Sequence, residues 1–355
     1  MKLYALIMAG GIGSRFWPRS KEKMPKQLLK IFGNNTMIQS TVERLNGVIP
    51  YENIFVITNN IQRDEIINQL SQIPKSNILV EPFGRNTAAC IGFASLLIGE
   101  KCKDAVTVVL PADHIIKDTA SFHSTLMEAA AFADEKRGLV TIGIIPTRPE
   151  TGYGYIQIDD TFVKNNIHKV LTFAEKPNYA TAVRFLESGD FLWNSGMFIW
   201  RIDVILEEID KLMPELAEGL SIIKQNIDSD SFNEVVSNVY GQLRNTSIDY
   251  GIMEKSKKVY LIKGDFGWSD VGSWEEVYQL SLKNDEGNAV VGRVFTDETT
   301  DSYIYSPNKF TAVIGAENFI VINTDDALLI CRRDKAQDVK KVIDHLKFNK
   351  LNDHL

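Results

Sequence analysis

Blocks of hydrophobic residues alternate with amphipathic stretches over the first half of the chain, and these blocks predict strands and helices in turn. Short apolar runs are typical of buried strands, and apolar positions repeating every three to four residues are typical of helices. Strands that alternate with helices predict an α/β fold with a mostly parallel sheet and helices on both faces. The predicted strands are residues 3–9, 53–58, 77–81, 105–110 and 139–144, and the helices are 36–46, 62–71, 87–101 and 121–134.

The second half has a less regular pattern and predicts a small separate module at its end. Residues 284–288 are polar and contain glycine, which is typical of a linker. We therefore expect a large domain over residues 1–283 and a β module with a terminal helix over residues 289–355. The predicted strands are residues 153–158, 169–173, 196–200, 258–262, 289–295, 302–305, 312–314, 319–322 and 328–331, and the helices are 179–188, stretches within 203–255, one from Ser273, and 335–347.

The segment that follows the first predicted strand reads GGIGSRFWPRSKEKMPKQL, from Gly10 to Leu28. Its glycines open a loop whose backbone N–H groups can approach an anion closely. Six of the residues 13–30 are Lys or Arg and only Glu22 is acidic, in a chain of net charge −7. Glycine-rich first turns also occur by chance, but a proline directly before Lys26 favours a fixed position for that lysine.

Composition narrows the function classes. The chain has 355 residues, of which 44% are hydrophobic and 24% charged, as in soluble globular proteins. A pI near 5.4 argues against a general nucleic-acid or membrane-surface binder. The cysteines are scattered and form no metal-binding or disulfide pattern, and no apolar run reaches about 20 residues. We expect a cytoplasmic enzyme.

Two aspartates lie where a divalent metal ion could bind. Asp113 directly follows the predicted strand 105–110, and Asp270 lies in the loop GWSDVG. Mg²⁺ takes one or two protein carboxylates together with substrate phosphates and water. The alternative for both residues is a helix cap or a turn.

Three further segments carry candidate ligands. Glu81 ends a predicted strand, and its carboxylate could accept two hydrogen bonds from guanine, although a surface glutamate is the simpler interpretation. Asn86 or Thr87 is expected to cap the next helix and could also bind a nucleotide. Glu175 and Lys176 suit a sugar and its phosphate, or form an exposed ion pair. Asn194 could bond hydroxyls or hold a turn, and His114 is not needed as a base.

Nine motifs occur in order along residues 9–274: AGGIGSRFWPRS, PKQLL, EPFGRNTA, PADH, ETGYGYI, EKP, FLWNSGMF, IDYGIMEK and WSDVGSW. Together they resemble the bacterial mannose-1-phosphate guanylyltransferases. The resemblance implies a Rossmann-like nucleotidyltransferase domain with a mixed, mostly parallel sheet and a small C-terminal left-handed β-helix module. The chain ends before the isomerase domain of longer relatives, so one activity is expected. Arg19 and Lys21 depart from the usual WPLSR pattern.

The resemblance also implies a reaction and its residues. GMP passes from GTP to mannose 1-phosphate, giving GDP-mannose and pyrophosphate, with Mg²⁺ as cofactor. Relatives that act on other sugar 1-phosphates, or that bind GDP-mannose without catalysis, are the alternatives. A homodimer is expected, with no nucleic-acid or membrane partner. The implied residues are Arg15, Lys26 and Lys176 for catalysis; Gly10, Gly11, Gly13, Arg15, Lys26, Glu81, Asn86, Thr87 and Asp113 for the nucleotide; Gly154, Glu175, Lys176 and Asn194 for the sugar phosphate; and Asp113 and Asp270 for the metal.

Overall fold

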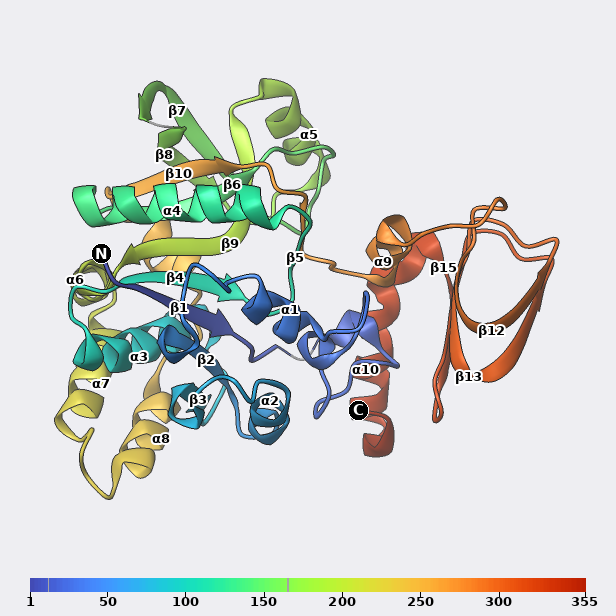
Figure 1. Cartoon of the computed structure of the whole chain (residues 1–355), viewed down its shortest axis with the longest axis horizontal. Coiled ribbons are helices and arrows are strands. Elements are labelled where there is room, and N and C mark those ends of the chain that lie inside the picture. The colour runs from blue at the N-terminus through green and yellow to red at the C-terminus, as the bar shows by residue number, and fades with distance from the viewer. Residues whose placement is uncertain (12, 165) are drawn as a thin grey trace. The chain divides into compact units, whose positions relative to one another are not determined.

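The computed structural model describes residues 1–11, 13–164 and 166–355 (Figure 1). Contacts along the backbone divide it into two compact units. The first unit comprises Met1–Gly10, Val42–Ala112 and Ile116–Trp268. The second comprises Gly11–Thr41, Asp113–Ile115 and Ser269–Leu355. The glycine-loop segment therefore belongs to the same unit as the C-terminal part of the chain.

The first unit is built on a nine-stranded sheet of order β3-β2-β1-β4-β9-β6-β10-β8-β7. Neighbouring strands are parallel from β3 to β4 and between β6 and β10. The strand β9 is antiparallel to β4, β6 and β7, and β8 is antiparallel to β10 and β7. The mixed sheet is confirmed. The expectation that it is mostly parallel is wrong, because four of these strand pairings are parallel and five are antiparallel. The strands are β1 Leu3–Met8, β2 Ile54–Asn59, β3 Ile78–Glu81, β4 Val106–Pro111, β6 Leu139–Ile144, β7 Tyr155–Lys164, β8 Ile167–Ala174, β9 Phe191–Arg201 and β10 Val259–Gly264.

Helices cover this sheet on both sides. Successive residues of a strand point to opposite faces, and Ala5, Leu6 and Ile7 in β1 are all fully buried. Both faces are therefore covered, as expected for a strand without polar alternation. The helices are α2 Arg63–Gln69, α3 Asn86–Lys101, α4 Thr119–Lys136, α5 Tyr179–Ser188, α6 Ile202–Leu212, α7 Pro214–Gln225 and α8 Phe232–Gln242, with 3₁₀ turns Tyr51–Asn53 and Lys75–Asn77 and a π-helix Asp249–Met253.

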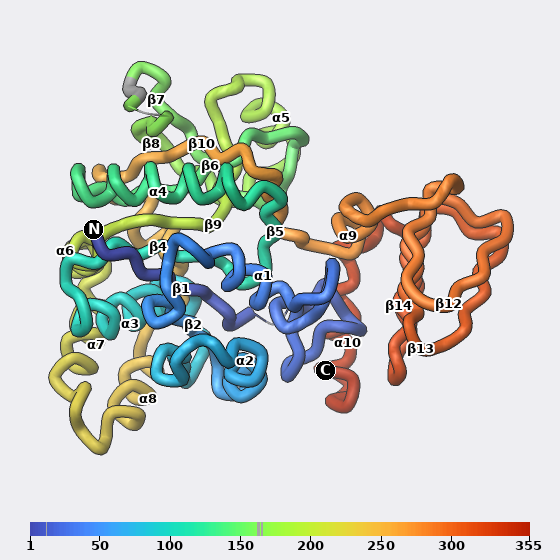
Figure 2. Tube along the Cα trace, in the orientation of Figure 1, coloured from blue at the N-terminus to red at the C-terminus, as the bar shows by residue number. Residues whose placement is uncertain are grey.

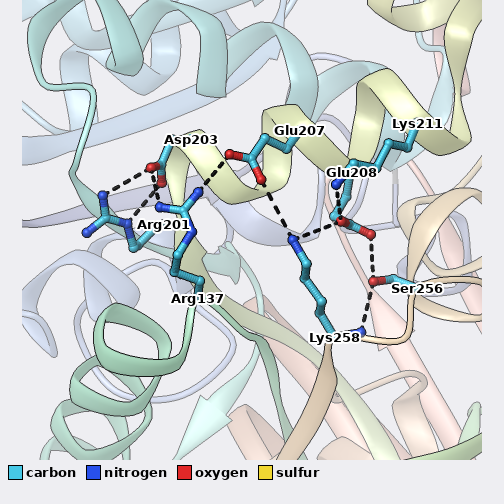
Figure 3. Close-up of polar contacts among 8 residues, drawn as sticks. All are labelled: Arg137, Arg201, Asp203, Glu207, Glu208, Lys211, Ser256 and Lys258. Carbon is cyan, nitrogen blue, oxygen red and sulfur yellow. Dashed lines mark hydrogen bonds and ion pairs between the residues drawn. The ribbon is translucent and has the colours of Figure 1, made fainter.

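An ion-pair network joins two of these helices to the strand β10 (Figure 3). Arg137, the residue that ends α4, contacts Asp203 and Glu207 of α6 at 2.7 Å each. Lys258, directly before β10, lies 3.2 Å from Glu208 and 3.7 Å from Glu207. The network holds α6 against the neighbouring elements with charged contacts.

The second unit has an aromatic core. Phe16 and Trp17 from the glycine-loop segment pack with Trp274 and Tyr303. The ring centroids of Phe16 and Trp274 are 5.0 Å apart, and the Trp274 indole donates a hydrogen bond to Trp17 O at 3.1 Å. The elements are 3₁₀ turns Ser14–Phe16 and Lys26–Leu28, α9 Trp274–Leu280, β12 Ala289–Asp297, β13 Tyr303–Ile314, β14 Phe319–Asn323, β15 Leu328–Arg332, a 3₁₀ helix Arg333–Val339, α10 Lys340–Phe348 and a 3₁₀ turn Asn352–His354; α1 Met37–Glu43, β5 Ile115–Ile116 and β11 Trp268–Ser269 lie where the chain passes between units.

The C-terminal strands follow one another as successive turns of chain (Figure 2). The strands β12, β13 and β14 pair in parallel, and β15 pairs antiparallel with β14. The two predicted strands 302–305 and 312–314 form the single strand β13, so that prediction is wrong. Gly292 pairs with Ser306 and Val294 with Thr311, so residues 307–310 bulge without ending the strand.

The predicted strand 196–200 is likewise only the end of the longer β9, which contains Gly196 at φ +69°. Within the described part of the chain, no helix is both long enough and apolar enough to cross a membrane.

Candidate active site

Lys26 is the most constrained charged residue of the glycine-loop segment. Pro25 precedes the short turn Lys26–Leu28, and Lys26 is only 4% exposed. Its Nζ lies 2.9 Å from Asp113 Oδ2 and donates to the main-chain oxygen of Asp270 at 2.5 Å. The predicted fixed position of Lys26 is confirmed, and three predicted site residues meet within the second unit.

The charges around Asp113 favour its ionised form. Burial raises the pKa of this carboxyl, but the Lys26 ammonium and the nearby His114 outweigh that effect, so its pKa is lowered. Neither Asp113 nor Asp270 caps a helix. Asp118 caps α4 by accepting from Ser121 N at 3.0 Å, and the residue before α9 is Ser273. Neither aspartate therefore occupies an N-cap position, and Asp113 lies in the turn after β4, as its alternative interpretation predicted.

The loop glycines differ in their surroundings. Gly13 has φ +58°, and a Cβ there would lie 2.7 Å from Lys26 Cβ, so only glycine fits this close approach. Gln27 donates to Gly11 O at 2.9 Å and fixes the loop from the other side. Arg15 is exposed and has no ion-pair partner in the described part of the chain.

Glu81 ends β3 and lies in the first unit with Gly10. A Cβ on Gly10 would lie 3.9 Å from Glu81 Oε2. Glu81 is 8% exposed, and its Oε1 has no hydrogen-bond partner among the described residues. Burial raises the pKa of Glu81 to about 7, against smaller opposing effects of Tyr240 and Cys90. Tyr240 and Cys90 are hydrogen-bonded to the carboxylate, and its Oε2 is the oxygen that faces Gly10.

The predicted capping role of Asn86 or Thr87 is wrong. The residue before α3 is Arg85, which makes no side-chain cap. Thr87 Oγ1 instead accepts from Ile248 N at 2.8 Å, because the chain near residue 248 runs past the start of α3. Asn86 has φ +66°, and its Oδ1 accepts from Thr87 N at 2.8 Å.

The four predicted sugar residues meet in the first unit. A Cβ on Gly154 would lie 2.6 Å from Glu175 Oε2 and 3.7 Å from Asn194 Nδ2, so these polar groups converge on the glycine. Lys176 Nζ lies 2.8 Å from Glu175 Oε1. The Lys176 side chain is 63% exposed and that of Glu175 only 17%, so the pair has one buried and one accessible partner.

Sequence reasoning missed one residue of this cluster, Asp249. It opens the π-helix, and its Oδ1 accepts from Asn194 Nδ2 at 2.8 Å. The only sequence signal was its place in the motif IDYGIMEK, to which no role could be given.

Arg19 and Lys21, which depart from the WPLSR pattern of the family, both make contacts within the second unit. The Arg19 guanidinium lies 4.2 Å from the centroid of the Tyr305 ring and donates to Lys30 O at 2.7 Å. Lys21 forms an ion pair with Asp326. Both side chains therefore attach the loop segment to the β module.

Comparison with known proteins agrees with this geometry. The nucleotidyl transferase family model matches residues 4–287, and the model of the MannoseP isomerase/GMP-like β-helix domain matches residues 292–346. Mannose-1-phosphate guanylyltransferases of Escherichia coli and Klebsiella pneumoniae are each 40% identical over 99% of this chain, which spans 75% of their length. A crystal structure described as mannose-1-phosphate geranyltransferase from Thermus thermophilus aligns with TM-score 0.88 and 31% identity, covering 98% of this chain and 100% of that one. The chain belongs to the mannose-1-phosphate guanylyltransferases, enzymes of the nucleotidyl transferase family.

Proposed function

We propose that this enzyme transfers GMP from GTP to mannose 1-phosphate and releases pyrophosphate. An oxygen of the sugar phosphate attacks the α-phosphorus in line, the bond from the α-phosphorus to the bridging oxygen breaks, and pyrophosphate leaves with the electron pair. Both reactants are anions, so catalysis consists mainly of positioning and of cancelling charge. The attacking oxygen is already ionised and needs no strong base.

The buried Lys26 ammonium is the observation that carries this proposal. Lys26 is 4% exposed, and its Nζ contacts both Asp113 and the main-chain oxygen of Asp270. Because this ammonium is already fixed in place, little free energy is spent on reorienting it when the leaving pyrophosphate gains charge. The backbone at Gly10, Gly11 and Gly13 and the exposed Arg15 would hold the rest of the triphosphate.

The base and the sugar are read by separate groups of residues. The carboxylate of Glu81 would accept from guanine, whose N1–H and exocyclic amine point the same way. The start of α3 at Asn86 and Thr87 would contact the nucleoside. Lys176, with its accessible ammonium, would hold the sugar phosphate. Gly154, Glu175 and Asn194 would contact the ring hydroxyls.

The residues around Lys26 also suit a magnesium ion. Among the described residues, no group of three or more His, Cys, Asp or Glu could hold a metal by itself. Two carboxylates fit Mg²⁺, which completes its shell with water and substrate phosphates. Asp113 and Asp270 would hold it, and Asp113 is ionised beside the Lys26 ammonium. Bound there, the ion would neutralise phosphate charge.

We also propose a homodimer in the cytoplasm. The β module exposes large apolar side chains, which is typical of a surface that another chain covers. Four such residues are at least half exposed: Phe295, Phe310, Ile314 and Ile330.

Pyrophosphate release tests the proposal directly. The enzyme is assayed with each of four nucleoside triphosphates against mannose, glucose and galactose 1-phosphates, in Mg²⁺ and in excess chelator. We expect the highest kcat/KM for GTP with mannose 1-phosphate, and no turnover in chelator. A preference for another triphosphate, or turnover that persists in chelator, would contradict the roles given to Glu81 or to the two aspartates.

A further inference from the structure

Asp249 occupies a place that the fold does not require a carboxylate to fill. It opens the π-helix Asp249–Met253, an element that is rare and is found disproportionately at functional sites. The next residue, Tyr250, is exposed, and the last three residues of the element, Gly251, Ile252 and Met253, are buried. Asp249 itself is only partly buried and points its Oδ1 at the Asn194 amide. Packing against the apolar core would need an apolar residue at this position and not a carboxylate.

The contacts of Asn194 fix which way its amide faces. Its Oδ1 accepts from Gly196 N at 3.1 Å, within its own strand. Its Nδ2 donates one hydrogen to Asp249 Oδ1 at 2.8 Å. An amide nitrogen carries two hydrogens, so one remains for a ligand. Asp249 therefore selects the amide orientation in which Asn194 offers a donor.

The charges nearby tie Asp249 to the same small region as Glu175 and Lys176. Burial raises the pKa of Asp249 above its ordinary value; the Asn194 hydrogen bond lowers it, the Glu175 charge raises it and the Lys176 charge lowers it. Asn194 Nδ2 also lies 3.7 Å, and Glu175 Oε2 2.6 Å, from the position of a Cβ on Gly154. Two carboxylates thus lie near one amide donor, beside a glycine whose missing side chain lets the Glu175 carboxylate come close.

We propose that Asp249 is a sugar-binding residue that determines specificity, with two effects. It orients the Asn194 amide, and it accepts a hydrogen bond from a ring hydroxyl of the sugar phosphate. A hydroxyl at this position donates to the carboxylate and accepts from the second N–H of Asn194, which satisfies both its donor and its acceptor. The inference rests on the proposed function, because it names a further ligand of the same sugar.

A sugar lacking that hydroxyl would leave the carboxylate and the amide unpaired. Sites that pair buried polar groups with a substrate hydroxyl reject analogues that lack it far more strongly than apolar pockets reject a missing methylene. The strength of this rejection should therefore depend on Asp249. A purely structural aspartate would not give that dependence.

The test combines Asp249→Asn with removal of single hydroxyls from the substrate, in the manner of a double-mutant cycle. Initial rates are measured with mannose 1-phosphate and with its 2-, 3-, 4- and 6-deoxy forms, at saturating GTP and Mg²⁺. We expect D249N to raise KM for mannose 1-phosphate at least ~10-fold with KM for GTP changed less than ~2-fold. One deoxy analogue should lose at least ~10-fold in kcat/KM with the wild type and less than ~3-fold with D249N.

Glu254→Gln is the matched control. Glu254 is also an acid close enough to interact with Asp249 and Glu175, but its side chain is exposed and its charge acts on them through space. The same loss of one negative charge should leave KM for mannose 1-phosphate within ~2-fold, since only charge and no hydrogen bond is removed. If E254Q raises this KM as much as D249N does, the proposed hydrogen bond is not the cause and the inference is wrong.

The remaining outcomes are also decisive. If every deoxy analogue loses the same factor in kcat/KM with the wild type and with D249N, Asp249 has only a structural role and the inference is wrong. If D249N does not fold, Asp249→Glu replaces it in the test. This variant keeps the charge but displaces the carboxylate by one methylene, so its loss of kcat/KM with the critical deoxy analogue should also be smaller than that of the wild type. If the wild type forms no GDP-mannose, the proposed function is wrong. This result differs from a failure of the inference about Asp249, in which the wild type is active and D249N behaves like it.

Discussion

The position of the Lys26 side chain depends on the absence of a side chain at Gly13. The Gly13 backbone is left-handed and lies directly against the Lys26 Cβ. The lysine is then held over the Phe16 ring, 5.3 Å from the centroid, and against Asp113 at 2.9 Å. The position of the ammonium thus depends on the glycine as much as on its own partners.

Gly13→Ala should therefore impair catalysis more than it impairs folding. Gly33→Ala is the control, because Gly33 has a similar φ of +69° but no atom within 4 Å of an added Cβ. Both variants should lose ~1 kcal/mol of stability from backbone strain. Only G13A should also lose kcat, by ~100-fold, approaching Lys26→Met. Chemical denaturation and steady-state rates check this, and an active G13A would show that the Lys26 position is not critical.

The raised pKa of Glu81 gives a pH dependence with a definite sign. Guanine binding needs the ionised carboxylate, whereas burial favours the neutral acid up to a pKa of about 7. In the free enzyme the carboxylate fraction rises through that pH. For folding the sign is opposite: a raised pKa stabilises the folded state at low pH, and this contribution is lost as pH rises from the ordinary value towards 7.

In the wild type, kcat/KM for GTP should rise between pH 6 and pH 8, and Glu81→Gln should flatten that rise. The comparison at each pH removes the titration of GTP itself, which both enzymes share. E81Q should also lose most of the preference for GTP over ITP, since inosine lacks the exocyclic amine. Identical pH profiles for the two enzymes would contradict a role for Glu81 in binding the base.

At the level of elements, the helix α6 depends on a carboxylate that is almost buried. Glu208 is 5% exposed and accepts from Ser256 Oγ at 2.7 Å, and Lys258 Nζ lies 3.2 Å away (Figure 3). Burial raises the pKa of Glu208, but these donors outweigh it and lower the pKa overall. Such a group stabilises the fold above the ordinary glutamate pKa and loses that effect as pH falls through its own lower pKa.

Glu208→Gln should destabilise the enzyme by ~2 kcal/mol at pH 7, because Lys258 and Ser256 lose a charged acceptor. Urea unfolding at pH 7 and at pH 4 measures the difference from wild type, which should shrink at the lower pH. Glu135→Gln, which removes the exposed ion pairs with Lys136 and Lys164, should be indistinguishable from wild type. Equal stability of E208Q and wild type at pH 7 would show that the network contributes nothing.

On the scale of the whole molecule, periodicity predicted most strands of the central sheet because their residues are buried on both faces, as in β1. It could not predict β13 as one strand, because the segment 307–310, which contains Pro307, Asn308 and Lys309, interrupts the apolar pattern while the pairing continues on both sides. Nor could it predict that residues 11–41 belong with the C-terminal residues, which depends on aromatic contacts such as Phe16 with Trp274.

The site was predicted in the same uneven way. Lys26 and Asp113 could be found because a proline, a strand end and a motif each marked them. Asp249 could not, because its role arises from a contact with Asn194, 55 positions away in the chain. The contacts of Arg19 with Tyr305 had no local signal either. The division at residues 283 and 289, the site roles and the homodimer stay predictions.

The proposed roles of all these residues depend on one reaction. Purified enzyme with Mg²⁺ is given equal concentrations of GTP, ATP, UTP and CTP in separate assays with mannose 1-phosphate, and pyrophosphate release is followed together with the nucleotide sugar formed. We predict GDP-mannose and pyrophosphate in equal amounts, with GTP preferred at least ~100-fold because the site pairs with guanine. Pyrophosphate release with no GDP-mannose, or equal use of ATP, would contradict the proposed function.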